Sequence, residues 1–291
     1  MEINTFIGLV LALISFSIGS SLQFSDFAKV IRYPKSLTLG LFLQLIFLPL
    51  LTLAVVYPLN LSNEIKMGML ILSLCPGGTT SNFISYLFQL ETALSVLLTS
   101  INSFVILITI PIGMAFFTEI FLQEELVVQI PFWNTVLQVF GFVLVPAFFG
   151  ILFNRFKPAL ADKMQTVLKG ANLLLLALVF AIKFFADESE GGTGISTAEV
   201  FELLPWLLLL HLLATFIAFA LSNMLLKNRI IGITIGVEVG LQNTTLALFI
   251  AGGFGALSAE LSKPALVYAL FSFFTIAGFS YFMKRLRKDT P

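Results

Sequence analysis

Long apolar runs, separated by short polar segments, make up most of this 291-residue chain. A helix that crosses a bilayer needs about 20 consecutive, mostly apolar residues, and about nine segments meet that requirement. We expect them at residues 4–22, 38–58, 66–89, 91–118, 131–154, 165–186, 200–226, 229–252 and 263–284. The pattern therefore predicts an all-α integral membrane protein with about nine transmembrane helices.

The composition agrees with this prediction and excludes several other classes of protein. The chain is 58% hydrophobic and only 11% charged, whereas soluble domains average about 25% charged residues. A soluble fold of this length cannot bury so much apolar surface, so lipid must be the solvent for much of it. The formal net charge is zero and the chain has no basic block, which argues against nucleic-acid binding. A single Cys excludes an intrachain disulfide.

Basic residues are distributed unevenly between the two ends of the predicted helices. If the loops alternate sides, Lys66, Lys183 and Lys263 fall on one side and the remaining 13 of the 16 Lys and Arg residues fall on the other. Cytoplasmic loops of membrane proteins carry an excess of Lys and Arg. We therefore expect a protein of the cell (inner) membrane with its N-terminus outside and its C-terminus in the cytoplasm. The first span has no positive residues before it, so we expect it to be retained rather than cleaved as a signal peptide.

The third predicted helix contains the sequence CPGGTTSN at Cys75–Asn82, which opposes a continuous helix. Pro76 lacks a backbone N–H and clashes with the preceding turn, and Gly77 and Gly78 allow the chain to leave helical geometry. Four polar residues follow at membrane depth. A proline kink, with Ser and Thr bonded back to their own helix, would explain Pro76. A break in the helix accounts better for the whole sequence.

An acidic residue, Glu238, lies in the middle of the eighth predicted helix. A charged side chain at the bilayer centre costs roughly 2.5–3.5 kcal/mol on insertion scales, so it is expected to face the protein interior and to have a function. Gly236 and Gly240 flank it, and Gln242 and Asn243 follow. A neutral Glu bonded to a neighbouring helix is the alternative, but it does not explain these glycines and amides. We therefore predict a second broken helix.

The two predicted breaks occupy matching places in the chain. Each lies in the middle helix of a triplet, one formed by the second to fourth helices and the other by the seventh to ninth. The two triplets enter the membrane from opposite sides. Such paired interruptions indicate an inverted-topology transporter with binding sites near the bilayer midplane.

A broken helix offers binding groups for charges of both signs. Carbonyls at the end of its first half, with a carboxylate, suit a hard cation such as Na⁺, and N–H groups at the start of its second half suit an anion. Other polar side chains at membrane depth are Ser95 and Thr99, four residues apart in the fourth helix, and Gln44 in the second. Taken alone, a pair such as Ser95 and Thr99 more often bonds to carbonyls of its own helix than to an ion, and Gln44 would indicate an interhelical hydrogen bond.

Several of these motifs resemble the bile acid:sodium symporter family in its bacterial-type, nine-helix form. They are CPGGTTSN at Cys75–Asn82, ALSVLLTS at Ala93–Ser100, EVGLQN at Glu238–Asn243 and D-F-x-x-V-x-x-x-P-K at Asp26–Lys35. The resemblance spans nearly the whole chain. It implies two crossing discontinuous helices in a core domain that packs on a panel domain. The panel would contain residues 1–37 and 128–197, and the core residues 38–127 and 198–291.

The same resemblance implies a set of site residues. One sodium site would contain Ser81, Asn82, Ser95, Thr99 and Glu238. A second would share Glu238 and add Gln44, Gln242 and the backbone carbonyls of Val239 and Leu241. The positions near bound substrate correspond to Thr79, Asn243 and Ser272. Two Na⁺ ions are thus expected as coupling ions, with no covalent cofactor.

Together these features predict a secondary active transporter that carries Na⁺ and a small organic anion, a carboxylate, in symport by alternating access. The partners would be that anion and the lipid bilayer, with no nucleic acid, and a monomer is compatible with the sequence. Members of the resembled family that bind bile acids carry polar residues in the ninth helix. The corresponding segment of this chain is ALFSFFTIAGF, whose polar residues are Ser272 and Thr275. We therefore expect a smaller carboxylate than a bile acid.

Other functions remain open at this point. Glu238 would be the proton site in a proton-coupled organic anion carrier, and Cys75 would matter in an oxyanion efflux carrier of related fold. An enzyme is not expected, because one His, one Cys and one intramembrane acid do not supply a nucleophile with its base or a metal cluster.

Overall fold

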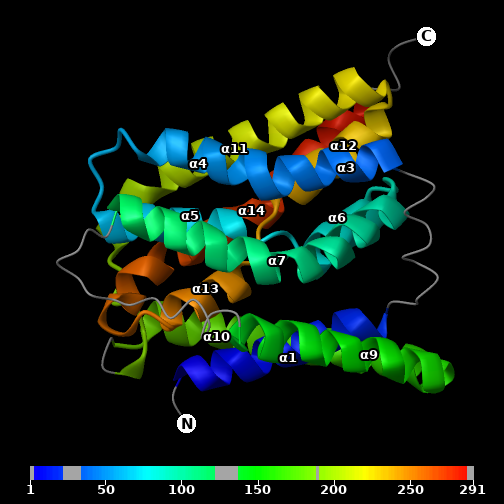
Figure 1. Ribbon diagram of the computed structural model, residues 1–291, viewed down its shortest axis with the longest axis horizontal. Coiled ribbons are helices and arrows are strands. Elements are labelled where there is room, and N and C mark those ends of the chain that lie inside the picture. The colour runs from blue at the N-terminus through cyan, green and yellow to red at the C-terminus, as the bar shows by residue number, and fades with distance from the viewer. Residues whose placement is uncertain (1–2, 22–33, 122–136, 188–189, 287–291) are drawn as a thin grey trace.

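The helices of this chain are described by a computed structural model that covers residues 3–21, 34–121, 137–187 and 190–286. All regular secondary structure in these ranges is helical, as the sequence predicts. Most of the long helices run roughly along the longest axis of the molecule, which is horizontal in Figure 1. In chain order the elements are α1 (Ile3–Ser20), α3 (Pro34–Phe42), η2 (Leu43–Phe47), α4 (Leu48–Val56), α5 (Asn63–Leu74), α6 (Thr79–Leu87), α7 (Thr92–Phe121), η3 (Phe140–Leu144), α9 (Val145–Phe156), α10 (Pro158–Phe185), α11 (Thr197–Leu226), α12 (Arg229–Gly240), α13 (Thr244–Gly252), η5 (Gly255–Leu257) and α14 (Ser258–Arg285).

In the described part of the chain, 6 helices are long and apolar enough to cross a membrane, judged by length and composition. A seventh span results if the two parts of α7, Thr92–Ile106 and Ile108–Phe121, form one bent span with an angle of 59°. These helices coincide with predicted spans, so an α-helical membrane architecture is confirmed in this coarse form. Residues 131–136 of one predicted span, and residues 22–33 with most of the Asp26–Lys35 motif, lie outside the described residues.

The other two predicted spans are interrupted helices. α5 ends at Leu74 before α6 begins at Thr79, and α12 ends at Gly240 before α13 begins at Thr244. α5 and α12 have 12 residues each, which corresponds to about 18 Å against a hydrocarbon core of ~30 Å, so neither crosses a bilayer alone. The first break falls at Pro76, which has no N–H to continue the helix. Both interruptions are therefore confirmed.

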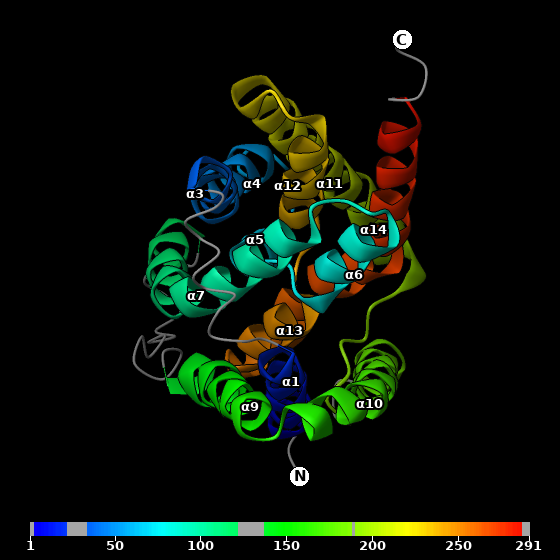
Figure 2. The same ribbon diagram turned by 90° about the vertical axis from the view of Figure 1, so that its right-hand side faces the viewer.

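The helices form two groups in space. α1, α9 and α10 form a layer on the lower side of Figure 2, and the other helices lie above it. α1 packs along α9 and also contacts α10 and α13. The close approach of α1 and α9 requires small residues, because a Cβ on Gly150 would collide with the carbonyl of Phe16. α13 is thus an element of the upper group that touches this layer.

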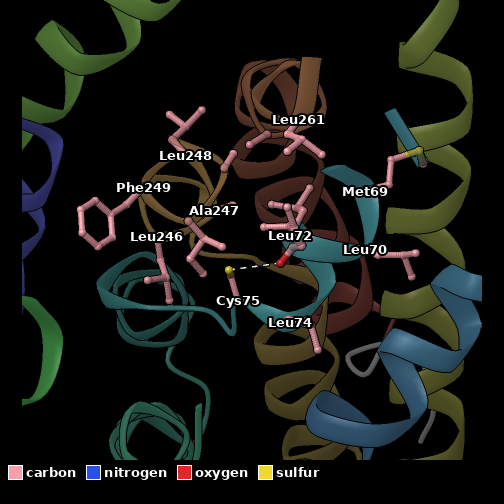
Figure 3. Close-up of a cluster of buried hydrophobic side chains, with 14 of the residues drawn as sticks. Met69, Leu70, Leu72, Leu74, Cys75, Leu246, Ala247, Leu248, Phe249 and Leu261 are labelled. Carbon is pink, nitrogen blue, oxygen red and sulfur yellow. Dashed lines mark hydrogen bonds between the residues drawn. The ribbon is translucent and has the colours of Figure 1, made fainter. Parts of the chain in front are cut away.

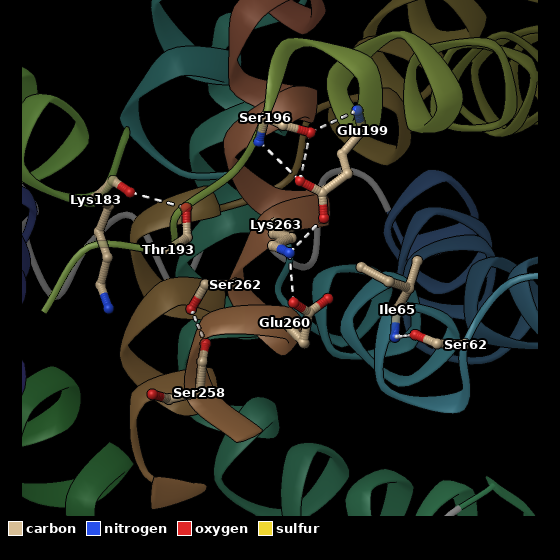
Figure 4. Close-up of polar contacts among 10 residues, drawn as sticks. All are labelled: Ser62, Ile65, Lys183, Thr193, Ser196, Glu199, Ser258, Glu260, Ser262 and Lys263. Atoms are coloured by element: carbon tan, nitrogen blue, oxygen red, sulfur yellow. Dashed lines mark hydrogen bonds and ion pairs between the residues drawn. The ribbon is translucent and has the colours of Figure 1, made fainter. Parts of the chain in front are cut away.

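Polar contacts fix the beginnings of α11 and α14 (Figure 4). Ser196 and Glu199 form a capping box at the start of α11, in which the Glu199 carboxylate accepts the Ser196 backbone N–H at 2.7 Å. Lys263 in α14 is only 4% exposed and pairs with Glu199 at 2.5 Å and with Glu260. A buried ammonium group needs such partners because its desolvation is costly. This ion triad therefore ties the first turn of α11 to the first two turns of α14.

A large cluster of buried apolar side chains surrounds the end of α5 and the start of α13 (Figure 3). Cys75 lies within it, close to Leu72, Leu246 and Ala247. The Cys75 thiol is fully buried and donates to the Ile71 carbonyl at 3.2 Å, one turn earlier in its own helix. The cysteine therefore belongs to the apolar core beside the helix break.

Candidate functional site

The two helix interruptions meet in the interior of the protein. Pro76 and Gln242 form an isolated antiparallel bridge, and the Asn243 backbone N–H donates to the Cys75 carbonyl at 3.0 Å. Each extended segment therefore supplies hydrogen-bond partners to the other, which the buried backbone groups of a broken helix need. The contact fixes the position of α5 and α6 relative to α12 and α13.

Gly77 is required by the closeness of this contact. A Cβ at Gly77 would lie 2.8 Å from the Leu241 carbonyl oxygen and 3.3 Å from that of Glu238. A residue without a side chain permits a close backbone approach of this kind. The glycine therefore brings the first interruption against the carbonyl end of α12, next to Glu238.

A cluster of oxygen atoms surrounds the Glu238 carboxylate, which is only 1% exposed. Thr99 donates to Glu238 Oε1 at 2.6 Å, and Ser95 lies 2.9 Å from Glu238 Oε2. Asn82 Oδ1 competes for the same hydroxyl protons, at 2.8 Å from Ser95 Oγ and 3.3 Å from Thr99 Oγ1. Each hydroxyl carries one proton, so these two protons cannot satisfy all three acceptor oxygens when Glu238 is ionised. An excess of oxygens over protons is an environment that suits a hard cation.

Ser81 lies beside this cluster. It is fully buried, and its hydroxyl donates to the Gly78 carbonyl at 2.8 Å within the first turn of α6. Its Oγ would lie 3.2 Å from a Cβ on Gly77, which places it at the crossing itself. Of the residues predicted for the first sodium site, the structure therefore joins Asn82, Ser95, Thr99 and Glu238 by hydrogen bonds and places Ser81 next to them.

A second polar cluster joins η2 to the carbonyl end of α12. The Gln44 amide donates to Gln242 Oε1 at 3.1 Å, and the Gln242 amide donates to the Val239 carbonyl at 2.7 Å. Gln44 Oε1 is buried and accepts no hydrogen bond from any described residue. A buried acceptor without a donor is uncommon and calls for an explanation. A cation bound beside Gln44 would supply one.

The local structure around Gln44 explains how its side chain reaches this place. Residues Leu43–Phe47 form a π-helical turn, in which the Leu48 backbone N–H bonds to the Leu43 carbonyl five residues earlier. Pro49 follows, and its missing N–H removes a donor that a regular helix would use. Single π-turns of this kind occur frequently at functional sites.

The residues predicted to lie near substrate are only partly brought together. Asn243 Oδ1 caps α13 by accepting the Leu246 N–H at 3.0 Å, and its amide nitrogen lies 3.7 Å from the position of a Cβ on Gly78. Thr79 begins α6 directly after Gly78, but its side chain lies outside the described residues. Ser272 is buried in α14, and its carbonyl oxygen lies 3.0 Å from the Thr275 hydroxyl oxygen.

Two residues near the site were not assigned a role in it from the sequence. The Tyr268 hydroxyl donates to the carbonyl of Gly240, the last residue of α12, and lies 2.8 Å from His211 Nδ1. His211 thereby links α11 to α14. The available signal was the single His and a Tyr within two long, mostly apolar spans, a pattern that by itself indicates only interhelical hydrogen bonding.

Comparison with known proteins gives a consistent result. A model of the Sodium Bile acid symporter family matches residues 8–189, more than half of the chain. The chain is 27% identical over 288 residues to the uncharacterized sodium-dependent transporter YocS of Bacillus subtilis. This alignment covers 98% of the chain and 85% of YocS. This second alignment extends over the Glu238 region, beyond the residues that the family model matches.

Eukaryotic relatives are also similar. The probable chloroplastic sodium/metabolite cotransporter BASS2 of Oryza sativa is 26% identical over 241 residues, 83% of the chain and 55% of BASS2. The human hepatic sodium/bile acid cotransporter is 24% identical over 250 residues, 84% of the chain and 69% of that protein. The chain thus spans most of the bacterial relative but only about half of the plant one.

These relatives are transporters and not enzymes, and each is named for its dependence on sodium or for cotransport with it. Long apolar helices and transporter relatives together identify an integral membrane protein. The match over more than half of its length shows that this chain belongs to the sodium bile acid symporter family.

Proposed function

We propose that this protein is a secondary active transporter that carries a small organic anion, a carboxylate, together with Na⁺ by alternating access. The observation that carries the proposal is the buried Glu238 carboxylate, which faces Ser95, Thr99 and Asn82 at the meeting point of two broken helices. The oxygens there outnumber the available protons, and all of them are hard ligands. Sodium-dependent relatives support the choice of Na⁺ as the cation.

Two Na⁺ ions share Glu238 in this proposal. The first binds among the oxygens of Ser81, Asn82, Ser95, Thr99 and Glu238. The second binds between Glu238 and a group made up of the Gln44 and Gln242 side chains and the Val239 and Leu241 carbonyls. The unpartnered Gln44 oxygen supports the second site, because a cation would satisfy an acceptor that no described donor reaches.

The anion binds at the second halves of the broken helices. α6 and α13 both begin at the crossing, so their N-terminal N–H groups and helix dipoles favour negative charge there. Thr79 and Asn243 at these termini, with Ser272 on α14, are the proposed substrate contacts. The relatives are named for the cotransport of metabolites or of bile acids with sodium. The sparse polar groups of the ninth predicted helix favour a small carboxylate.

The proposed movement occurs between two domains. The panel comprises residues 1–37 and 128–197, and the core comprises residues 38–127 and 198–291. The separate layer of α1, α9 and α10 in Figure 2 supports this division. The matching interruptions support an inverted repeat within a nine-span core-and-panel fold. The chain would lie in the cell (inner) membrane with its N-terminus outside and its C-terminus in the cytoplasm.

The sodium gradient is sufficient for such a carrier. Two Na⁺ with one monoanion move one net charge, which contributes about 2.3 kcal/mol at ~100 mV. A roughly tenfold Na⁺ gradient adds about 1.4 kcal/mol for each ion. The total of about 5 kcal/mol supports accumulation of the anion on the order of a thousandfold.

The test measures thermal stabilisation of the purified protein by Na⁺ against K⁺, with and without a panel of small carboxylates. Na⁺ but not K⁺ should stabilise the parent protein, and one or more carboxylates should add to the effect only in Na⁺, because ligands that bind the folded state raise its stability. Glu238→Gln should fold and lose the Na⁺ response. Ser100→Ala is the matched control, because Ser100 is buried in the same helix as Ser95 but, among the described residues, its hydroxyl bonds only to the Val96 carbonyl.

Uptake into proteoliposomes completes the test. Carboxylate uptake that requires an inward Na⁺ gradient supports the proposal. Uptake that persists without Na⁺ and follows the pH gradient would instead favour proton coupling at Glu238. An equal Na⁺ response in Glu238→Gln and the parent protein would show that the proposed cation sites are wrong.

A further inference from the structure

A buried hydrogen-bond chain connects two helices to the carbonyl end of α12. His211 on α11 is 2% exposed, and its Nδ1 lies 2.8 Å from the Tyr268 hydroxyl on α14. The Tyr268 hydroxyl donates to the Gly240 carbonyl. The other ring nitrogen, His211 Nε2, lies 2.7 Å from the hydroxyl of Thr275, which is also on α14. The imidazole is thus fixed at both ring nitrogens between two hydroxyl groups.

The available protons determine the direction of this chain. Tyr268 has a single hydroxyl proton, and it is used for the Gly240 carbonyl, so the tyrosine oxygen must accept a proton from His211 Nδ1. In the neutral imidazole the other nitrogen, Nε2, is then an acceptor. The Thr275 hydroxyl lies 2.7 Å from Nε2, nearer than the Ser272 and Phe271 carbonyls at 3.0 and 3.2 Å, and donates to it. The hydrogen bonds run from Thr275 through His211 and Tyr268 to Gly240. They require one particular tautomer of the histidine.

Close packing fixes Gly240, the residue at which the hydrogen-bond chain ends. A Cβ at Gly240 would collide with Thr215 Oγ1 and would lie 2.7 Å from a methyl group of Ile276. Thr215 is itself fixed, because its hydroxyl donates to the His211 carbonyl at 2.7 Å. The glycine therefore allows the last turn of α12 to press between α11 and α14, where Tyr268 reaches its carbonyl.

The Gly240 carbonyl, which accepts the Tyr268 hydroxyl, lies between two backbone carbonyls of the second proposed sodium site. Gly240 separates Val239 from Leu241, whose carbonyls belong to the second proposed sodium site, and it follows Glu238 by two residues. A carbonyl that accepts the Tyr268 hydroxyl is directed toward α14. Because adjacent peptide planes share a Cα atom, fixing this carbonyl limits the rotation of the peptide planes on either side.

We propose that His211 and Tyr268 are positioning residues that set the geometry of the second sodium site by holding the Gly240 carbonyl toward α14. This inference rests on the proposed sodium-coupled function. It assigns no ion contact to either side chain. Both act through the backbone at the end of α12.

The first test compares the Na⁺ concentration for half-maximal stabilisation in Tyr268→Phe and in the parent protein. Loss of one buried hydrogen bond should raise this half-maximal Na⁺ concentration about threefold to tenfold. At saturating Na⁺, the KM for the transported carboxylate should change little. Tyr281→Phe is the matched control, because the Tyr281 ring is half-exposed and its hydroxyl contacts only Arg285 among the described residues. An unchanged or lower half-maximal Na⁺ concentration in Tyr268→Phe overturns the proposal.

Two substitutions of the histidine separate positioning from simple packing. His211→Leu removes the donor to Tyr268 and should weaken Na⁺ binding as Tyr268→Phe does. His211→Asn carries an amide N–H near the place of Nδ1 and should restore much of the parent Na⁺ affinity. Melting temperature without Na⁺ shows whether each variant folds. Equal Na⁺ affinities for folded His211→Leu and His211→Asn overturn the proposal.

The histidine is the only one in the sequence, so its nuclear magnetic resonance signal needs no assignment. In protein labelled with ¹⁵N-histidine, the structure requires a protonated Nδ1 and an unprotonated Nε2, and Na⁺ should shift this signal. The opposite tautomer, or a signal that does not respond to Na⁺ while the melting temperature does, overturns the proposal. Failure of the sodium function itself is distinguishable, because Na⁺ would then stabilise neither the parent protein nor any of these variants.

Discussion

Thr99 on α7 donates its hydroxyl to the Glu238 carboxylate on α12 at 2.6 Å, across 139 positions of the chain. The same hydroxyl lies 3.3 Å from Asn82 on α6. One side chain thus connects α7 with the second half of one broken helix and the first half of the other. A cation bound there would contact all three elements at once, which couples its binding to their arrangement.

Thr99→Val should weaken Na⁺ binding while leaving the fold intact. Valine has nearly the shape of threonine but offers no oxygen to a cation and no proton to Glu238. A lost bond to a charged group should raise the half-maximal Na⁺ concentration for thermal stabilisation about tenfold or more. Thr118→Val in the same helix is the control, since Thr118 donates only to the Met114 carbonyl at 2.8 Å. Equal Na⁺ responses in both variants would remove Thr99 from the site.

Gln44→Ala should reduce the number of bound Na⁺ ions. The substitution removes the buried oxygen without a partner, and with it a side-chain ligand of the second proposed site. The Hill coefficient for Na⁺-dependent uptake should fall from near two toward one. Gln165→Ala is the control, because Gln165 on α10 bonds to Ser20 far from Glu238. A Hill coefficient that stays at the parent value in Gln44→Ala would contradict the two-ion proposal.

Gly77→Ala should destabilise the protein. The added methyl group would lie 2.8 Å from the Leu241 carbonyl oxygen, so one of the two interruptions must move. Overpacking of this kind costs about 1–3 kcal/mol in the free energy of unfolding. Gly170→Ala on α10 is the control, because a Cβ there meets nothing within 4 Å, and alanine favours helix over glycine by up to about 1 kcal/mol. The melting temperature should fall for Gly77→Ala and hold or rise for Gly170→Ala.

Lys263→Met should lower stability, because the Glu199 and Glu260 carboxylates would lose their cationic partner. Lys263 is buried, whereas the Glu199 and Glu260 side chains are 34% and 39% exposed, so water partly compensates for the lost ammonium group. We expect a loss of about 1–2 kcal/mol, less than for a fully buried pair. Lys66→Met is the control, since Lys66 is more exposed than Lys263 and has no carboxylate partner among the described residues. Its ammonium group makes a long 3.4 Å bond to the Tyr57 carbonyl and lies 5.8 Å from the Phe121 ring centroid. Equal melting temperatures for the two variants would show that the triad contributes no net stability.

Local sequence features were sufficient to predict the helices and their interruptions. Apolar runs long enough to cross a bilayer coincide with the long helices, and Pro76 with the adjacent glycines marks the first break. These predictions succeed because helix length and backbone freedom depend on neighbouring residues along the chain. The start of α14 was less well predicted: the helix begins at Ser258, before the expected residue 263, and Lys263 within it is paired with Glu199 and Glu260.

The sequence by itself determined that the chain is an α-helical membrane protein with two interrupted helices and one acid between two glycines at membrane depth. Its motifs also indicated the family. Only the tertiary structure decided which polar groups meet: Gln44 with Gln242 across 198 positions, and Tyr268 with the Gly240 carbonyl. The physical reason is that a helix or a break follows from adjacent residues, whereas a buried hydrogen bond depends on which distant segments pack together and on how many protons their side chains can share.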